Sequence, residues 1–579
     1  MELSIPAVRR AADELITGPN ADPGVANRLR NSVARPLAAV AGHALDRPGQ
    51  TAAGTGDPDA LWRLTVAVTA LRVANPDVPE LAEAGAALQD LVLDGEAAAS
   101  RRAVIEAMQA HLPSRLQVMR DGPYLLTNPA SLRDALGQSL PTRPQLALCR
   151  CGGSQRKPLC DGSHARLGFT DAKDPNRVPD RRDEYTGQQA DILDNRGLCQ
   201  HAGLCTDRLP TVFHAQGSSF VTASGGRMDE IIRAVRDCPS GALSFAVDGV
   251  EARDQVDHHG RREAEVMVTR DGPYRVTGGI PLVDHDGNDV ARNAGASREH
   301  YALCRCGHSQ NKPFCSGMHY HVEFRDPVAS DEHRPSVFEW AGGLPAFTRM
   351  TRLFYEKHVP QDPLLGPLFA TMSPDHPQRV AKWLSEVFGG PRHYSADHGG
   401  YPHMLSAHIG KGISEEQRAR WVSLLLQSAR EAGLPNDAEF RSAFGAYIEW
   451  GSRLAVENSQ SGARPPGNMP MPSWDWTTAA GPPGSRISAL APPPAGQEPV
   501  PLPGPDETVS FATHVKPLFR ALDQRSMSFV FDLWSYADVS AHAEAIAERL
   551  RSGSMPCDGA WPDQRIAVFQ RWIDSGKPA

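Results

Sequence analysis

The spacing of apolar and polar residues divides the chain into segments of different character. Residues 1–112 place alanine and leucine at helical spacing, as in PDALWRLTVAVTALRVA, and this pattern predicts a helical bundle. Residues 336–460 continue this periodicity in longer stretches and predict an all-α domain. Residues 507–579 predict a small helical C-terminal domain, and the proline-rich residues 461–506 before it predict an extended linker.

A different pattern occurs twice between the first two helical segments. RDGPYLLTN at 120–128 and RDGPYRVTG at 270–278 combine a Gly-Pro turn with residues that favour strands. We therefore expect two small β-rich modules, over 113–170 and 262–325, with a further unit at 185–250 between them. The predicted fold class is multidomain α+β.

Composition narrows the class of protein. The chain has 579 residues, 40% of them hydrophobic and 22% charged, with a net charge of −8. This charge does not favour a nucleic-acid-binding protein, which usually has a basic surface. No stretch predicts a secretory signal or a membrane span, so we expect a cytoplasmic protein. Nine of the ten cysteines fall into three groups, a distribution more typical of metal sites than of disulfides.

Two cysteine groups share one spacing. Residues 149–164 and 304–319 both contain Cys-x-Cys, eight residues, Cys, three residues and His. Three thiolates and one imidazole at this spacing predict a metal site, and the ligand set alone allows zinc. The candidate ligands of the two copies are Cys149, Cys151, Cys160 and His164, and Cys304, Cys306, Cys315 and His319.

The amino-acid sequence of these motifs closely resembles that of the CDGSH iron–sulfur family. The first copy contains the letters CDGSH at residues 160–164, whereas the second has Ser316 in place of Asp and Met318 in place of Ser. The resemblance implies one 2Fe-2S cluster in each copy. Members of this family commonly bring two such clusters together, so we expect the two motifs to be adjacent.

The third cysteine group comprises Cys199, Cys205 and Cys238, the last followed by proline. Ala202 occupies the position of the middle cysteine in the ferredoxin pattern C-x₂-C-x₂-C. The segment resembles the divergent single-cluster ferredoxin domain found beside CDGSH motifs. This resemblance implies a 3Fe-4S cluster, or a 4Fe-4S cluster with one more ligand, for which His201 is the nearest candidate. A zinc site or cysteines without metal remain alternatives.

Residues 338–460 resemble a truncated haemoglobin of the second group. The matching stretches are FEWAGGLPAFTRMTRLFYEKH, DPLLGPLF, WLSEVFGGPRHYS, GGYPHMLSAHIGKGISEEQRARW and AYIEWGSRLAVENS. The resemblance implies a haem b with His408 as its proximal ligand and His376 in the distal pocket. It places Tyr355 and Trp421 over a bound ligand and packs Phe369 on the haem.

Together these segments predict a protein that passes electrons from iron–sulfur clusters to a globin haem, which binds or reduces O₂, NO or related ligands. Such a chain could be an oxidoreductase, either a globin-based dioxygenase or a reductase. No nicotinamide or flavin motif is present, so we expect a separate reductase or ferredoxin as electron donor. The alternative is a redox or gas sensor, or a cluster carrier, without turnover.

Overall fold

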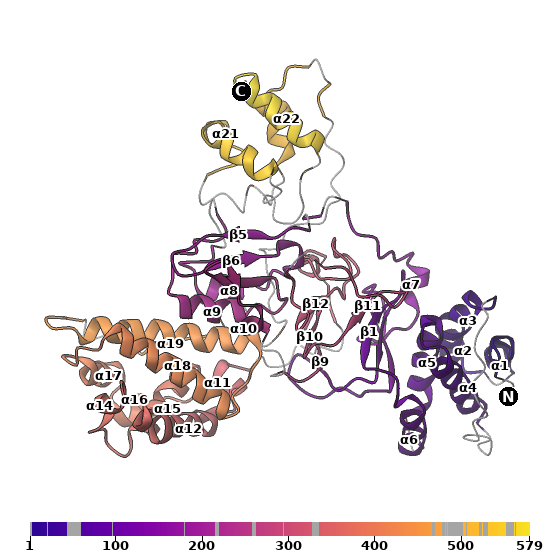
Figure 1. Ribbon diagram of the computed structural model, residues 1–579, viewed down its shortest axis with the longest axis horizontal. Coiled ribbons are helices and arrows are strands. Elements are labelled where there is room, and N and C mark those ends of the chain that lie inside the picture. The colour runs from indigo at the N-terminus through magenta and orange to yellow at the C-terminus, as the bar shows by residue number, and fades with distance from the viewer. Residues whose placement is uncertain are drawn as a thin grey trace.

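Figure 1 shows the computed structural model as a central group of small sheets with helical parts around it. The structure describes residues 3–19, 21–42, 59–94, 97–175, 177–178, 180–214, 219–257, 262–292, 295–322, 324–326, 335–465, 469–476, 481, 483, 502–504, 507–519, 524, 531–551, 561 and 563–579. Most of the predicted linker and Cys557 lie outside these residues. The combination of helices and sheets makes the fold multidomain α+β.

The N-terminal part is helical. Its helices are α1 (Ile5–Thr17), α2 (Pro23–Leu29), α3 (Arg35–Ala39), α4 (Ala60–Ala74), α5 (Pro79–Val92) and α6 (Ala98–Gln109). Asp59 caps α4, because its carboxylate accepts hydrogen bonds from the N–H groups of Leu61 and Trp62. Helix α5 is buried along almost its whole length, since it packs on α4 and on the first sheet.

Three four-stranded sheets form the centre, in the orders β11-β1-β2-β4, β12-β10-β9-β3 and β5-β6-β7-β8. The strands of the first two sheets are β1 (Arg115–Val118), β2 (Tyr124–Thr127), β3 (Leu132–Arg133), β4 (Gln145–Leu148), β9 (Glu265–Val268), β10 (Tyr274–Thr277), β11 (Leu282–Val283) and β12 (Tyr301–Leu303). The third sheet and its helices are β5 (Asp183–Tyr185), β6 (Asp191–Asp194), α8 (Leu204–Arg208), α9 (Met228–Arg236), β7 (Leu243–Val247), β8 (Val250–Glu251) and α10 (Arg253–Asp257).

The two repeats exchange strands. Strand β11 of the second repeat pairs in parallel with β1 of the first, and β3 of the first pairs with β9 of the second. The sequence predicts one small β-rich module for each repeat, and the structure interlocks the two repeats into one body with a shared apolar core. The exchanged strands have only two residues each, which is too short to give a periodic pattern.

The remaining parts are helical. The large domain comprises α11 (Val337–Trp340), α12 (Gly343–Arg352), α13 (Val359–Gln361), α14 (Gly366–Phe369), α15 (His376–Val387), α16 (His393–His398), α17 (Tyr401–His408), α18 (Glu415–Glu431) and α19 (Ala438–Ser459). Helices α21 (Tyr536–Arg551) and α22 (Asp563–Asp574) form a separate unit with its own core. No helix among the described residues is long and apolar enough to cross a membrane.

The large helical domain is joined to the sheets by buried ion pairs. The guanidinium of Arg275 on β10 donates to both carboxylate oxygens of Glu439 on α19, at 2.7 and 2.6 Å. Both side chains are less than 10% exposed, at 9% and 5%. A bidentate pair of this kind fixes direction as well as distance, so it orients α19 against the second repeat.

We expect Glu439→Ala to lower the free energy of unfolding by about 3–5 kcal/mol, because it leaves a buried guanidinium without its carboxylate. Arg120→Ala is the control, since it breaks the exposed Arg120–Asp286 pair; its cost should stay below about 1 kcal/mol. Thermal unfolding of the metal-loaded protein, followed by circular dichroism, measures both. Equal midpoints for the two variants would contradict this assignment.

Candidate metal and haem sites

In the first motif the four predicted donors lie in two pairs. The Sγ atoms of Cys149 and Cys151 are 3.9 Å apart, and Sγ of Cys160 lies 3.4 Å from Nδ1 of His164. Gly162, at a φ of 84°, turns the chain between Cys160 and the short helix α7 (Ser163–Arg166). A left-handed turn of this kind favours glycine, and it brings the imidazole back towards the thiol.

The second motif repeats the arrangement, with Cys304 and Cys306 at 3.8 Å and Cys315 and His319 at 3.4 Å between the same atoms. In each motif a cysteine thus pairs with a cysteine and a cysteine with the histidine.

The two motifs are adjacent, as the resemblance implies. Cys151 and Cys306 form an antiparallel β-bridge, and a Cβ on Gly152 would lie 2.4 Å from the carbonyl oxygen of Cys306. Tyr124 donates to the carbonyl oxygens of Cys304 and Pro313 at 2.9 Å. Its counterpart makes the reciprocal bonds at 3.0 Å, from Tyr274 to Cys149 and Pro158.

The second motif compensates for its departures in sequence. In the first copy the Asp161 carboxylate accepts from the N–H of Gln155 at 2.9 Å, which ties the loop together. In the second copy the Ser316 hydroxyl accepts from the N–H of Gln310 at 3.1 Å, so serine performs the same task. Met318 is buried and packs in a small apolar cluster.

Residues of the N-terminal helices cover His164. Nη2 of Arg35 lies 2.9 Å from its Nε2, and Oε1 of Glu83 lies 3.6 Å from the same atom. Burial, and then the charge of Arg35, lowers the pKa of His164 to about 4, and burial raises the pKa of Glu83 to about 7. Burial also lowers the pKa of His319, to about 3. Both imidazoles are therefore neutral at pH 7, as a metal ligand must be.

The three cysteines of the middle group pack at the same apolar core, with Cys238 buried and Cys199 and Cys205 partly buried. Cys199 follows a short turn, Cys205 lies in α8 and Cys238 follows α9. Burial, followed by the neighbouring thiolates of Cys199 and Cys238, raises the pKa of Cys205 well above its usual range. The His201 N–H donates to Sγ of Cys199 at 3.3 Å. The structure thus groups the three predicted thiols.

The middle group lies beside the second CDGSH motif. A Cβ on Gly317 would lie 3.0 Å from Cδ2 of His201, so the imidazole packs against this motif. The side chain of Asn311 donates to the carbonyl oxygen of Gly197 at 2.7 Å. This proximity is not visible in the sequence, because the two segments are 114 residues apart.

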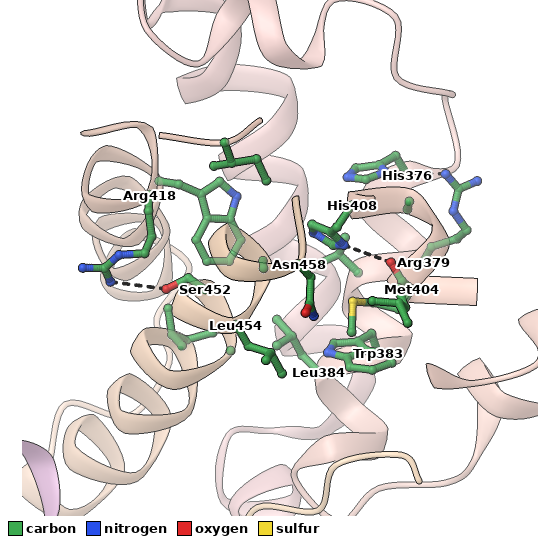
Figure 2. Close-up of a pocket in the computed structure, with 18 of the residues that line it drawn as sticks. His376, Arg379, Trp383, Leu384, Met404, His408, Arg418, Ser452, Leu454 and Asn458 are labelled. Carbon is green, nitrogen blue, oxygen red and sulfur yellow. Dashed lines mark hydrogen bonds between the residues drawn. The ribbon is translucent and has the colours of Figure 1, made fainter. Parts of the chain in front are cut away.

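The large helical domain contains a cavity of about 240 Å³. All five predicted haem-pocket residues line it, namely Tyr355, Phe369, His376, His408 and Trp421. Figure 2 shows the hydrogen bond from Nδ1 of His408 to the carbonyl oxygen of Met404, one helical turn back, at 2.9 Å. With Nδ1 donating, Nε2 of His408 keeps its lone pair free for a metal.

His376, Tyr355 and Phe369 form an aromatic group in this cavity. The rings of Tyr355 and His376 are 4.7 Å apart and perpendicular, at 89°. Burial lowers the pKa of His376 to about 4, and its buried Nε2 has no hydrogen-bond partner among the described residues. An unpaired buried nitrogen of this kind suits a bound ligand better than a packed core.

Arg418 is a cavity residue that the sequence does not reveal. It lies across the cavity from His376 in Figure 2 and is 3% exposed. Its guanidinium donates to Ser452 at 3.5 Å and to Glu230 of α9 at 3.1 Å. The cavity wall is therefore bonded directly to the middle domain.

Family models match four regions of the chain. The model described as iron-binding zinc finger CDGSH type matches residues 121–165 and 271–320. A divergent 4Fe-4S mono-cluster model matches residues 185–248, and a bacterial-like globin model matches residues 336–442. The chain therefore contains two CDGSH-type regions, a divergent mono-cluster region between them and a globin region.

Curated relatives match single regions. The group 2 truncated hemoglobin YjbI of Bacillus subtilis is 25% identical over 119 residues, covering 21% of this chain and 87% of the relative. The uncharacterized protein YjdI of Escherichia coli K12 is 28% identical over 61 residues, covering 10% of this chain and 80% of the relative.

Two solved haemoglobins are similar to the globin region. That of Chloroflexus aurantiacus is 30% identical and covers 21% of this chain and 98% of its own, with a TM-score of 0.19. That of Thermobifida fusca is 29% identical and covers 21% and 97%, with a TM-score of 0.20. The family matches and the globin relative support a redox or gas-binding protein that uses iron–sulfur clusters and haem.

We expect Glu83→Met to weaken metal binding in the first motif by about 10- to 100-fold, because its carboxylate is the nearby group that can accept the Nε2 proton of a ligating His164. Chelator-driven release of iron should then show one accelerated phase, while the phase from the second motif stays unchanged. Glu80→Met is the matched control, since Glu80 lies on the same helix and pairs with His285 instead. Unaltered release from Glu83→Met would contradict the prediction.

His408→Ala should lose haem, whereas His403→Ala should keep it. Both histidines lie in α17 and line the cavity, but His403 is exposed. Loss of a group that supports a metal ligand typically lowers affinity by about 10- to 100-fold. Loss of the ligand itself should lower the affinity for haem at least as much. The measurement is the haem-to-protein ratio, with the rate of haem transfer to apomyoglobin. Equal retention by both variants would rule out His408 as the ligand.

Proposed function

We propose that the chain is a multicentre redox protein in which iron–sulfur clusters supply electrons to a globin haem that binds or reduces O₂, NO or a related ligand. The observation that carries this proposal is a continuous series of contacts from the first motif to the globin cavity. Covalent linkage keeps donor and acceptor at high effective concentration.

The contacts define an order in space. The first motif meets the second at the Cys151–Cys306 bridge. The second motif meets the middle domain where His201 packs on Gly317. The middle domain meets the cavity wall through Glu230 and Arg418, and its α8 packs on α19. One series of contacts therefore runs from the first motif through the second motif and the middle group to the globin, although the middle group lies between the two motifs in the sequence. The second repeat also contacts α19 directly, through Arg275 and Glu439.

Each group of donors would hold its own cofactor. The proposed 2Fe-2S ligands are the two sets of three cysteines and one histidine. Cys199, Cys205 and Cys238 would hold a 3Fe-4S cluster, or a 4Fe-4S cluster with one more ligand. A haem b would be ligated by Nε2 of His408. All nine cysteines among the described residues are free thiols, which favours a reducing compartment such as the cytoplasm.

The chain's own residues would prepare the haem cavity for a small ligand. His408 would present its unprotonated Nε2, fixed by the bond from Nδ1 to Met404. His376 and Tyr355 would offer polar hydrogens to a small ligand in the cavity, within an otherwise largely apolar lining. Haem supplies reversible ligand binding and electron transfer at iron. The electron donor would be a separate reductase or ferredoxin.

A sensor without turnover is the second candidate. The hydrogen bond between Arg418 and Glu230 favours it, because a movement of Arg418 in the cavity wall would directly displace its partner in the middle domain. A measurement of reductant consumption in the presence of O₂ or NO distinguishes the redox protein from the sensor. A sensor would bind the ligand without consuming reductant.

The first experiment is an anaerobic absorption spectrum with quantification of iron, sulfide, zinc and haem. A Soret band with acid-labile sulfide, and more iron than haem, would support the proposed cofactors. Zinc without sulfide would overturn them.

The path itself is tested by stopped-flow reduction of the haem under carbon monoxide with substoichiometric dithionite. We expect Cys199→Ser to slow haem reduction by about tenfold or more, equivalent to about 1.4 kcal/mol of barrier, while haem content stays unchanged. Cys557→Ser, which removes the cysteine outside the three groups, is the matched control. Equal rates in wild type and Cys199→Ser would show that electrons reach the haem without the middle site.

A further inference from the structure

A second cavity, of about 250 Å³, lies between the middle domain and the globin domain. Its lining includes one carboxylate, Asp237, and six arginines, namely Arg208, Arg233, Arg236, Arg262, Arg430 and Arg441. These arginines come from α8, α9, the segment before β9, α18 and α19. Only the folded chain brings them together.

Carboxylates close to the cavity fix some of these arginines in place. Glu449 accepts from Arg208 at 3.0 Å and from Arg233 at 2.9 Å. Asp237 accepts from Arg441 at 2.8 Å. These pairs hold the guanidinium groups in defined positions, as a preorganised binding site requires.

Neighbouring arginines in the cavity lie close enough for their positive charges to repel one another. Arg262 has its nearest carboxylate, that of Glu299, at 3.4 Å. Burial, and then the neighbouring charge of Arg441, lowers the pKa of Arg262. A bound anion would relieve this repulsion, and guanidinium groups bind phosphate and carboxylate in bidentate geometry.

The other wall of the cavity is apolar. Phe440 and Phe444 of α19 line it, with Leu426 of α18. We propose that this cavity binds a small organic anion with at least two negative charges, whose phosphate or carboxylate groups meet the arginines while its apolar part lies against the two phenylalanines. This inference does not depend on electron transfer between the clusters and the haem.

The location gives such an anion a route to both neighbouring sites. Asp237 directly precedes Cys238 of the middle cysteine group. Glu449, which holds Arg208 and Arg233, is followed in α19 by Trp450 and Gly451, which line the haem cavity. A bound anion would thus change the contacts of residues that flank a metal site on one side and the haem cavity on the other.

Isothermal titration calorimetry of the full metal-loaded chain tests the proposal. The probes are pyrophosphate, ATP and citrate, with chloride as the monovalent comparison. We expect saturable binding of one site per chain that weakens with salt, and the tighter class of probe identifies phosphate or carboxylate as the preferred group. If no divalent or multivalent probe binds in this way, the proposal is wrong.

Arg262→Met should lower the affinity for the tightest-binding probe at least tenfold. Arg262→Lys should lower this affinity less, because lysine keeps the positive charge. Arg227→Met is the matched control, since Arg227 precedes the same helix α9 but does not line the cavity. Circular dichroism and haem content establish that each variant is folded. Unchanged affinity in folded Arg262→Met, or an equal loss in Arg227→Met, would overturn the assignment.

Discussion

Two buried phenols connect the halves of the central body. Tyr124 and Tyr274 are fully buried, so their hydroxyls must find partners inside the protein. Each finds them in the backbone of the opposite repeat, beside the first cysteine of that repeat's motif. Neither repeat can therefore satisfy its own tyrosine. This exchange, with the strand exchange around it, brings Cys151 against Cys306 and gives the second motif its place beside the middle domain.

What the sequence predicts depends on how local the interaction is. The four donors of the first motif lie within residues 149–164, so their spacing alone indicates a metal site. The lining of the globin cavity could be predicted through the resemblance of that segment to a known family. By contrast, Arg35 and His164 are 129 residues apart, and Glu230 and Arg418 are 188 apart. Such pairs leave no pattern in one sequence, because neither partner constrains the neighbours of the other.

The separation of chain order from spatial order has the same origin. The middle domain is inserted between two repeats that pair with each other, so both of its ends are attached to the same body. Its α8 and α9 then face the globin, where the buried pair of Arg208 and Glu449 holds α19. The cysteine groups and the globin cavity are thereby connected through packed helices and strands.

The alanine that replaces the middle cysteine has a consequence for how the chain can be divided. Ala202 is 9% exposed and packs, with Leu204, in the apolar core of the globin domain. A fragment that ends near residue 250 would present this apolar patch to water, and a fragment that begins near residue 336 would expose the matching face of α19. The two excised pieces would tend to associate with each other or to aggregate. The globin domain and the middle domain should therefore be produced together to stay in solution, whether or not electrons pass between them.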